Sequence, residues 1–336
     1  MRIAVDAMGG DLAPAEVVQG TLAAATEFTD TQFILVGDEA AIQAELGAAR
    51  HDNIVVRHAA QVIGMEDDPA KSIRRKPDSS LTVSARMVAE GAADALFSAG
   101  NTGAVTTAAA LLIGRLDGVL RPGIATLLPT RARSGWSIVC DVGACVDSKA
   151  EWIVQFGVMA AIYAEEVERI PSPRVGLLNI GEESSKGDRE SRQAHALFGD
   201  AGVNWVGNVD GKDVFRGQAD VIACDGFNGN SLLKVSEGAA EYFMELVRSA
   251  IESTTVSKLG GLLIRPSMRR LKQRIDYTEV GGAFLLGIKG LVVIGHGRST
   301  RKAIFHALRR TREGVQRELV QRLAARFATT ANVAVV

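Results

Sequence analysis

The sequence predicts an α/β fold: a doubly wound, mainly parallel sheet with helices on both faces. Short apolar runs alternate along the chain with segments of helical length, a pattern typical of βαβ units. The chain has 336 residues, of which 47% are hydrophobic, so it can bury a large core. Because no repeat or low-complexity linker divides it, we expect a single domain over residues 1–336.

The predicted elements follow this alternation from the amino terminus onward. Strands are expected at Arg2–Asp6, Phe33–Gly37, Ile54–His58, Ala95–Ser98, Ile124–Leu128, Ser137–Asp141, Val175–Asn179, Val221–Asp225 and Leu291–Gly295. Helices are expected at Pro14–Phe28, Leu81–Gly91, Ala104–Ile113, Lys149–Glu168 and Arg189–Phe198. The charged tail from Arg298 to Arg326 predicts a packed terminal helix with one solvated face.

Charge and composition narrow the classes of partner. The net charge is −1, so nothing draws the chain as a whole to nucleic acid. Three cysteines form no C-x-x-C pair, and no signal peptide or bilayer-spanning run is visible, which favours the cytoplasm. The histidines lack metal-ligand spacing, and Gly295–Thr300 lacks the third small residue of a dinucleotide fingerprint. We therefore expect no nucleic-acid partner, no metal and no cofactor.

The turn Ser98–Gly103 is the most informative local feature. It follows an apolar run and precedes a predicted buried helix, so its backbone N–H groups are left unpaired where the helix dipole favours an anion. Asn101 and Thr102 add side-chain donors, and the small size of the turn suits a phosphoryl group. The alternative is a tight turn that uses glycine only for its backbone angles.

Glycine is combined with polar side chains after other predicted strands as well. These turns are Asp6–Asp11, Asp141–Ala144, Asn179–Gly187, Asp225–Asn230 and Gly295–Ser299. Ligands of open α/β sheets bind at the carboxyl ends of the strands. The sequence therefore predicts a polar cleft that several of these turns share.

Separate motifs carry a resemblance to a known family. They are Asp6–Asp11, Ile73–Lys76 with Asp78–Ser80, Ser98–Ala104, Leu177–Glu183 with Lys186–Gly187, Cys224–Asn230, Leu285–Gly287 and His296–Gly297. In this order they resemble the phosphate acyltransferase family of phospholipid synthesis, the PlsX family. The resemblance implies transfer of a fatty acyl group from acyl carrier protein to inorganic phosphate, giving acyl phosphate. Two departures are Cys145, where Asn is expected, and Phe284, where Pro is expected.

Candidate site residues combine the turns with this resemblance. Candidate catalytic residues are Lys186, Asn228 and His296, and candidate substrate-binding residues are Gly100, Asn101, Thr102, Gly103, Asp141, Asn179, Asp225 and Asn230. Lys186 matches the loop lysine of the family and is expected to hold phosphate or to stabilise an oxyanion. The alternatives are a solvated lysine, helix caps at Asn228 and Asn230, and a structural histidine.

The segment Lys258–Ile275 carries six basic residues and no acidic one, together with an apolar stripe. With the helix predicted from Ser231, it indicates a projecting helical hairpin over residues 231–277. Such a face suits an anionic membrane or the acidic carrier protein, and the alternative is a homodimer contact. The expected contact residues are Lys258, Leu263, Arg265, Arg269 and Arg270. We expect a cytoplasmic homodimer that is peripherally attached to the membrane.

Other functional classes remain as alternatives. A phosphotransacetylase or a hydroxyacid dehydrogenase would use a similar α/β cleft, although the incomplete fingerprint at Gly295 disfavours a nucleotide-dependent dehydrogenase. A noncatalytic scaffold at the membrane is the third class. The intact polar turns argue against it.

Overall fold

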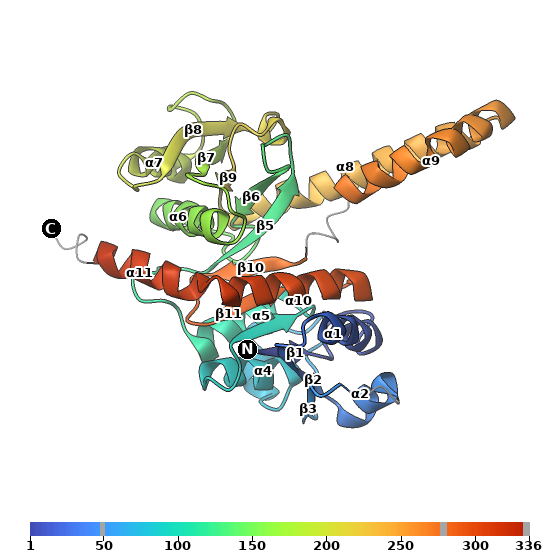
Figure 1. Cartoon of the computed structure of the whole chain (residues 1–336). Coiled ribbons are helices and arrows are strands. Elements are labelled where there is room, and N and C mark those ends of the chain that lie inside the picture. Colours follow the sequence, from blue (N-terminus) through green and yellow to red (C-terminus); the bar gives the residue numbers. More distant parts are fainter. Residues whose placement is uncertain (48–50, 276–280, 332–336) are drawn as a thin grey trace.

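The computed structural model describes residues 1–47, 51–275 and 281–331. In that part of the chain, one eleven-stranded sheet is covered by helices on both faces, and a helical hairpin projects from it (Figure 1). The predicted fold class is confirmed. The single domain over residues 1–336 stays a prediction.

The strands occupy most of the positions that the sequence predicts. They are β1 (Arg2–Asp6), β2 (Gln32–Gly37), β3 (Ile54–His58), β4 (Ala95–Ser98), β5 (Gly123–Pro129), β6 (Trp136–Cys140), β7 (Arg174–Asn179), β8 (Asn204–Asp210), β9 (Val221–Ala223), β10 (Ala283–Leu286) and β11 (Leu291–Ile294). Their order in the sheet is β3-β2-β1-β4-β11-β10-β5-β6-β9-β7-β8. Strands β8 and β10 have no counterpart among the predicted elements.

Not every helix follows the prediction. The helices are α1 (Ala15–Glu27), α2 (Glu39–Leu46), α3 (Pro69–Arg75), α4 (Ser80–Ala89), α5 (Thr102–Ala108) with a π-helical turn (Ala109–Ile113), α6 (Ala150–Glu166), α7 (Arg189–Phe198), α8 (Gly226–Glu252), α9 (Thr255–Ile275), α10 (Arg301–Gln316) and α11 (Leu319–Ala331). Helices α2 and α3 have no counterpart among the predicted elements, and two further helical segments depart from the prediction. Helix α8 begins before Ser231 because Asp225 caps it, accepting from the amides of Phe227 and Asn228, each at 2.9 Å. The terminal segment forms two helices, separated by Glu318 at φ 54°.

Strand direction reverses in the middle of the sheet. Strand β10 is antiparallel to both β11 and β5, and β5 is antiparallel to β6, while the other neighbours are parallel. Neighbouring strands twist by roughly 20–25°, so the five steps from β4 to β9 turn the sheet by roughly 100–125°. The carboxyl ends of the two oppositely directed halves are thereby brought toward a common side of the molecule.

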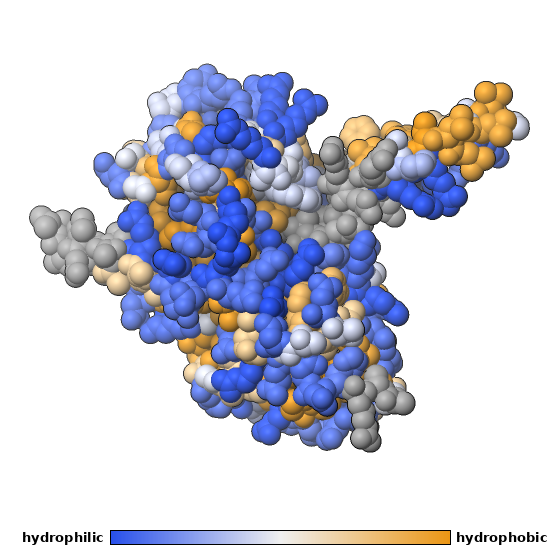
Figure 2. All heavy atoms as spheres, in the orientation of Figure 1, coloured by the Kyte–Doolittle hydropathy of each residue, from blue (hydrophilic) through white to orange (hydrophobic). Residues whose placement is uncertain are grey.

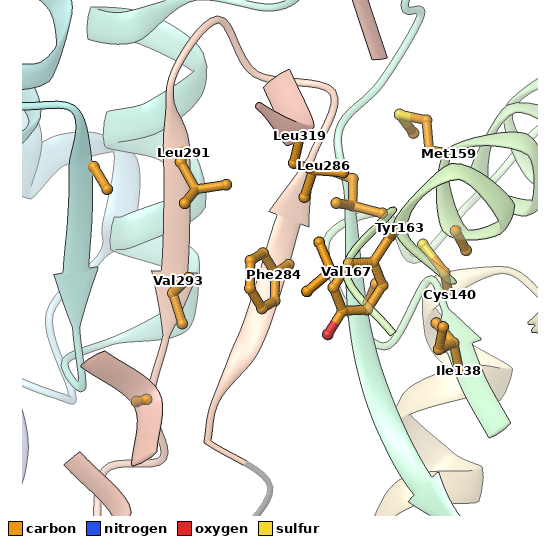
Figure 3. Packing of buried hydrophobic residues seen from close by; sticks show 14 of the residues in the cluster. Ile138, Cys140, Met159, Tyr163, Val167, Phe284, Leu286, Leu291, Val293 and Leu319 are labelled. Carbon is orange, nitrogen blue, oxygen red and sulfur yellow. The ribbon is translucent and has the colours of Figure 1, made fainter. Parts of the chain in front are cut away.

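The chain after the hairpin joins the two halves. In Figure 1, β10, β11 and α10 lie between the lobe of β1–β4 and the lobe of β6–β9. Figure 3 shows Phe284 of β10 facing Tyr163 of α6, and the two ring centroids are 4.7 Å apart. Arg310 of α10 donates to the Tyr163 hydroxyl at 2.8 Å and pairs with the half-buried Glu168. This packing fixes the two lobes against each other and so defines the space between them.

Candidate functional site

A cleft of about 460 Å³ lies between the two lobes. The lobe of β1–β4 contributes Asp11, Met65 and Thr102, and the other lobe contributes Gly143 and the inner face of α8. The loop after β11 and the start of α10 close the cleft between them. Residues far apart in the sequence thus meet at the side where the twisted sheet brings its carboxyl ends together.

The turn after β4 is held from beneath by a buried carboxyl group. Ser98 Oγ donates to Asp6 Oδ2 at 2.6 Å and accepts from the Gly100 amide at 3.1 Å. A Cβ on Gly9 would lie 2.6 Å from Asp6 Oδ2 and 2.9 Å from the Gly100 nitrogen, so only glycine fits there. Burial raises the pKa of Asp6 above its usual range. This network sets the position of the backbone amides that follow.

Within the turn, the residues have different tasks. Asn101 caps α5 through Oδ1, which accepts from the Ala104 amide at 3.0 Å, and its Nδ2 donates to the carbonyl of Met65 at 2.8 Å. A second Nδ2 bond reaches the Asp67 carbonyl at 3.2 Å, so the side chain ties the turn to this loop rather than offering a spare donor. Gly103 packs against Pro69, and Thr102 lines the cleft.

Helix α8 places two charged residues in the cleft, Lys234 and Glu237, that were not identified as site residues from the sequence, next to the predicted Asn230. Asn230, Lys234 and Glu237 line the cleft from one face of α8, spaced three or four residues apart. Lys234 Nζ lies 2.9 Å from Glu237 Oε2, and the Glu237 side chain is only 13% exposed. The spacing of four and three residues between Asn230, Lys234 and Glu237 indicates a shared helix face, but the prediction placed residues 231–277 in the projecting hairpin.

His296 faces the same cleft from the loop after β11. Its Nδ1 accepts from the Arg298 amide at 3.2 Å, which favours the neutral ring. Burial lowers the pKa of His296, and the positive charge of Lys234 lowers it further. His296 is therefore held neutral next to a cation.

A second cleft of about 630 Å³ lies on the other side of the α8 amino terminus. Asp225 and Asn228 line it, and Asn228 Nδ2 donates to Asp225 Oδ2 at 2.5 Å. Asn228 and Asn230 are two positions apart in a helix, so their side chains point in different directions and line different clefts. The first turn of α8 separates the two spaces.

Asp141 organises the loop between the two clefts. Its Oδ1 accepts from the amides of Ile124, Gly143 and Ala144 at 2.8, 3.1 and 3.0 Å, and its Oδ2 accepts from Cys145 at 2.7 Å. Burial raises the pKa of Asp141 to about 6 against the opposing effect of these bonds. Its carboxylate is thus engaged with backbone donors.

Lys186 lies in the loop after β7, which Asn179 holds together. Asn179 Oδ1 accepts from the Ile180 amide at 2.8 Å, and Nδ2 donates to the Lys186 carbonyl at 3.2 Å. The Lys186 side chain is exposed and lines neither cleft. Its near neighbour Asp188 does line the second cleft. The structure therefore places Lys186 near the second cleft and apart from Thr102 and His296.

The hairpin of α8 and α9 carries exposed apolar and basic side chains. Leu263 is 83% exposed, and Lys258, Arg265 and Arg269 are exposed, while the Arg270 side chain and residues 276–277 lie outside the described part. Figure 2 shows hydrophobic side chains gathered at the free end of the hairpin, beside a hydrophilic strip. No helix among the described residues is long and apolar enough to cross a bilayer. In the same ranges, no His, Cys, Asp or Glu side chains group in threes as metal ligands.

Known proteins resemble this chain over nearly its whole length. The model of a family described as fatty acid synthesis protein matches residues 1–322. The phosphate acyltransferase of Bacillus licheniformis is 43% identical over 95% of this chain and 96% of that protein. The phosphate acyltransferase of Bacillus subtilis is 42% identical, with 95% and 96% covered. A phosphotransacetylase from Streptococcus pyogenes has a TM-score of 0.61 at 13% identity over 94% of each chain, a likeness of fold alone.

Proposed function

Because this chain belongs to the fatty acid synthesis protein family, we propose that it transfers a fatty acyl group from acyl carrier protein to inorganic phosphate. The product is an acyl phosphate for phospholipid synthesis. One observation carries the proposal: a single cleft joins the polar turn after β4, the charged face of α8 and an apolar wall. Such a cleft suits a reaction between a hydrophilic anion and a hydrocarbon chain.

The chemistry requires positioning and charge more than a protein nucleophile. A phosphate oxygen attacks the thioester carbonyl, the carbon–sulfur bond breaks, and the thiolate leaves on the carrier and takes up a proton. Burial raises the pKa of Cys145 to about 11 and those of Cys140 and Cys224 well above their usual range. These thiols are protonated at neutral pH, so they are poor nucleophiles, in keeping with direct attack by phosphate.

The position of each residue in the clefts indicates its role in the proposed reaction. Thr102 and the neighbouring turn amides hold phosphate, with Asn230 and Lys234 opposite them. Attack by phosphate moves negative charge onto the carbonyl oxygen of the thioester, and Lys234 stabilises this oxyanion. Asn228 acts from the second cleft, where the carrier arm approaches, and Lys186 acts from the exposed loop after β7, whose residue Asp188 lines that cleft. The neutral His296 accepts a proton from phosphate.

The test of function is phosphate-dependent release of the carrier thiol from acylated acyl carrier protein. We expect release to require both phosphate and a fatty acyl donor. The same assay with short-chain coenzyme A thioesters tests a phosphotransacetylase, and reduction of a nicotinamide cofactor tests a dehydrogenase. Activity confined to either of those assays would overturn the proposal.

Lys186→Ala is expected to remove most of the turnover, by about tenfold or more, and to leave the fold intact. This loss is smaller than the loss expected for a buried cation, because an exposed ammonium group in water interacts more weakly with an anion. Steady-state kinetics and thermal melting measure the two properties. Lys289→Ala is the matched control, because this exposed lysine lies in the turn between β10 and β11 and does not line the cleft. Near-normal turnover of Lys186→Ala would remove Lys186 from the mechanism.

The hairpin is proposed to attach a cytoplasmic homodimer to the membrane surface and to meet the acidic carrier protein. Exposed apolar side chains on α8, Tyr242 and Phe243, suit a second copy of the hairpin, and the basic residues of α9 suit anionic lipid. Leu263→Glu is expected to abolish flotation with anionic vesicles and to leave a dimer in analytical ultracentrifugation. Unchanged flotation contradicts the membrane contact, and a monomer instead assigns Leu263 to the dimer interface.

A further inference from the structure

The cleft between the lobes has an apolar wall that phosphate chemistry does not use. Ile124, Ala283 and Ile294 belong to neighbouring strands, and Leu233 of α8 lines the same space. A phosphate ion is small and strongly hydrated, so it neither fills about 460 Å³ nor gains from apolar contacts. The wall therefore suits an apolar group of the other substrate rather than phosphate.

The strand register leads this wall away from the turn after β4. Ser98 pairs with Ile294, and Ile294 pairs with Ala283. Leu285, two residues beyond Ala283 and on the same face, pairs with Ile124. Directly paired residues of neighbouring strands share one face of the sheet. The cleft residues Ile294, Ala283 and Ile124 thus share one face of the sheet, and they form a path from beside Ser98 across β11 and β10 to β5.

We propose, on the basis of the proposed function, that this path binds the hydrocarbon chain of the acyl donor. The thioester lies beside Thr102, the tail follows β11 and β10, and the size of residue 283 limits the length of the chain. The volume of the cleft, about 460 Å³, lies within the roughly 300–1,000 Å³ of small-molecule sites. Each methylene that leaves water favours binding by roughly fourfold, so longer chains are preferred until the path is filled.

Ala283 is the position that tests this proposal. Its side chain is partly exposed to the cleft, so a larger residue there extends into open space rather than into the packed core. Phenylalanine is also compatible with a strand. Ala283→Phe is therefore expected to shorten the path with little damage to the fold.

The experiment compares wild type and Ala283→Phe on acyl carrier protein loaded with hexadecanoyl or butanoyl chains. We expect kcat/KM for the hexadecanoyl donor to fall by about tenfold or more, with the butanoyl value unchanged within about twofold. Ala283→Leu is expected to lower kcat/KM for the hexadecanoyl donor by a smaller factor. It takes the place of Ala283→Phe if that variant does not melt cooperatively. Equal losses with both donors, or no loss with either, overturn the proposal.

Direct binding separates this proposal from the proposed function. Calorimetry with hexadecanoate and butanoate measures wild type and Ala283→Phe without turnover. Hexadecanoate binding that is weakened in the variant supports the chain site even where phosphate-dependent transfer is absent. Equal hexadecanoate affinity of the two proteins overturns it even where transfer is present.

Discussion

Gly229→Ala is expected to destabilise the protein by at least about 3 kcal/mol, because α8 has no room for a methyl group at this position. A Cβ there would overlap the Asp141 carbonyl oxygen and lie 2.8 Å from Cys224 Sγ. Gly226, one turn earlier, is also confined, with its added Cβ 2.6 Å from the Cys145 carbonyl oxygen. These neighbours are backbone atoms and a buried side chain, which cannot move aside without disturbing the core.

Thermal melting measures the effect, and a fall in Tm of roughly 5 °C or more is expected. Gly238→Ala is the matched control in the same helix, because no described atom lies within 4 Å of its added Cβ. That substitution is expected to stabilise the protein by about 0.5–1 kcal/mol through helix propensity alone. Similar small effects at the two positions would contradict the close seating of α8 on the loop around Asp141.

The sequence predicts most of the strands of the sheet and misses two. Buried strands such as β1 and β4 were predicted because their side chains are apolar on both faces. Strand β8 lies at the edge of the sheet, and its alternating exposure with Asn204 and Asn208 made it resemble a loop. Strand β10 has only four residues, and its place beside β5 is decided by long-range pairing rather than by local pattern.

The site was predicted to a similar extent. Turns at strand ends were identified because glycine and polar residues follow apolar runs, and Thr102, Asn230 and His296 do line one cleft. Lys234 and Glu237 were not predicted as site residues, because the sequence pattern of a helix does not show which part of the fold each of its faces meets. The contacts of Gly226 and Gly229 settle that orientation, and they exist only in the folded chain.

Lys234→Met is expected to lower kcat/KM by about 100-fold, because it removes the cation in the cleft that we propose to stabilise the oxyanion. Its ion pair with Glu237 spans one helical turn and is worth only about 0.2–0.5 kcal/mol, so Tm should change little. Lys234→Arg keeps the charge and should retain more activity than Lys234→Met. Lys289→Met, away from the cleft, should leave kcat/KM unchanged.

The pH dependence gives a second readout of Lys234. The pKa of His296 lies below its ordinary 6.5, first through burial and then through the charge of Lys234. Without that charge, protonation of His296 costs less, so its pKa rises while the effect of burial remains. The acid limb of the kcat/KM profile, where neutral His296 is lost, should therefore move to higher pH in Lys234→Met and stay in place in Lys289→Met. Normal kcat/KM at neutral pH would exclude Lys234 from the working site. An unmoved acid limb would show that His296, whose pKa depends on the charge of Lys234, is not the group that titrates there.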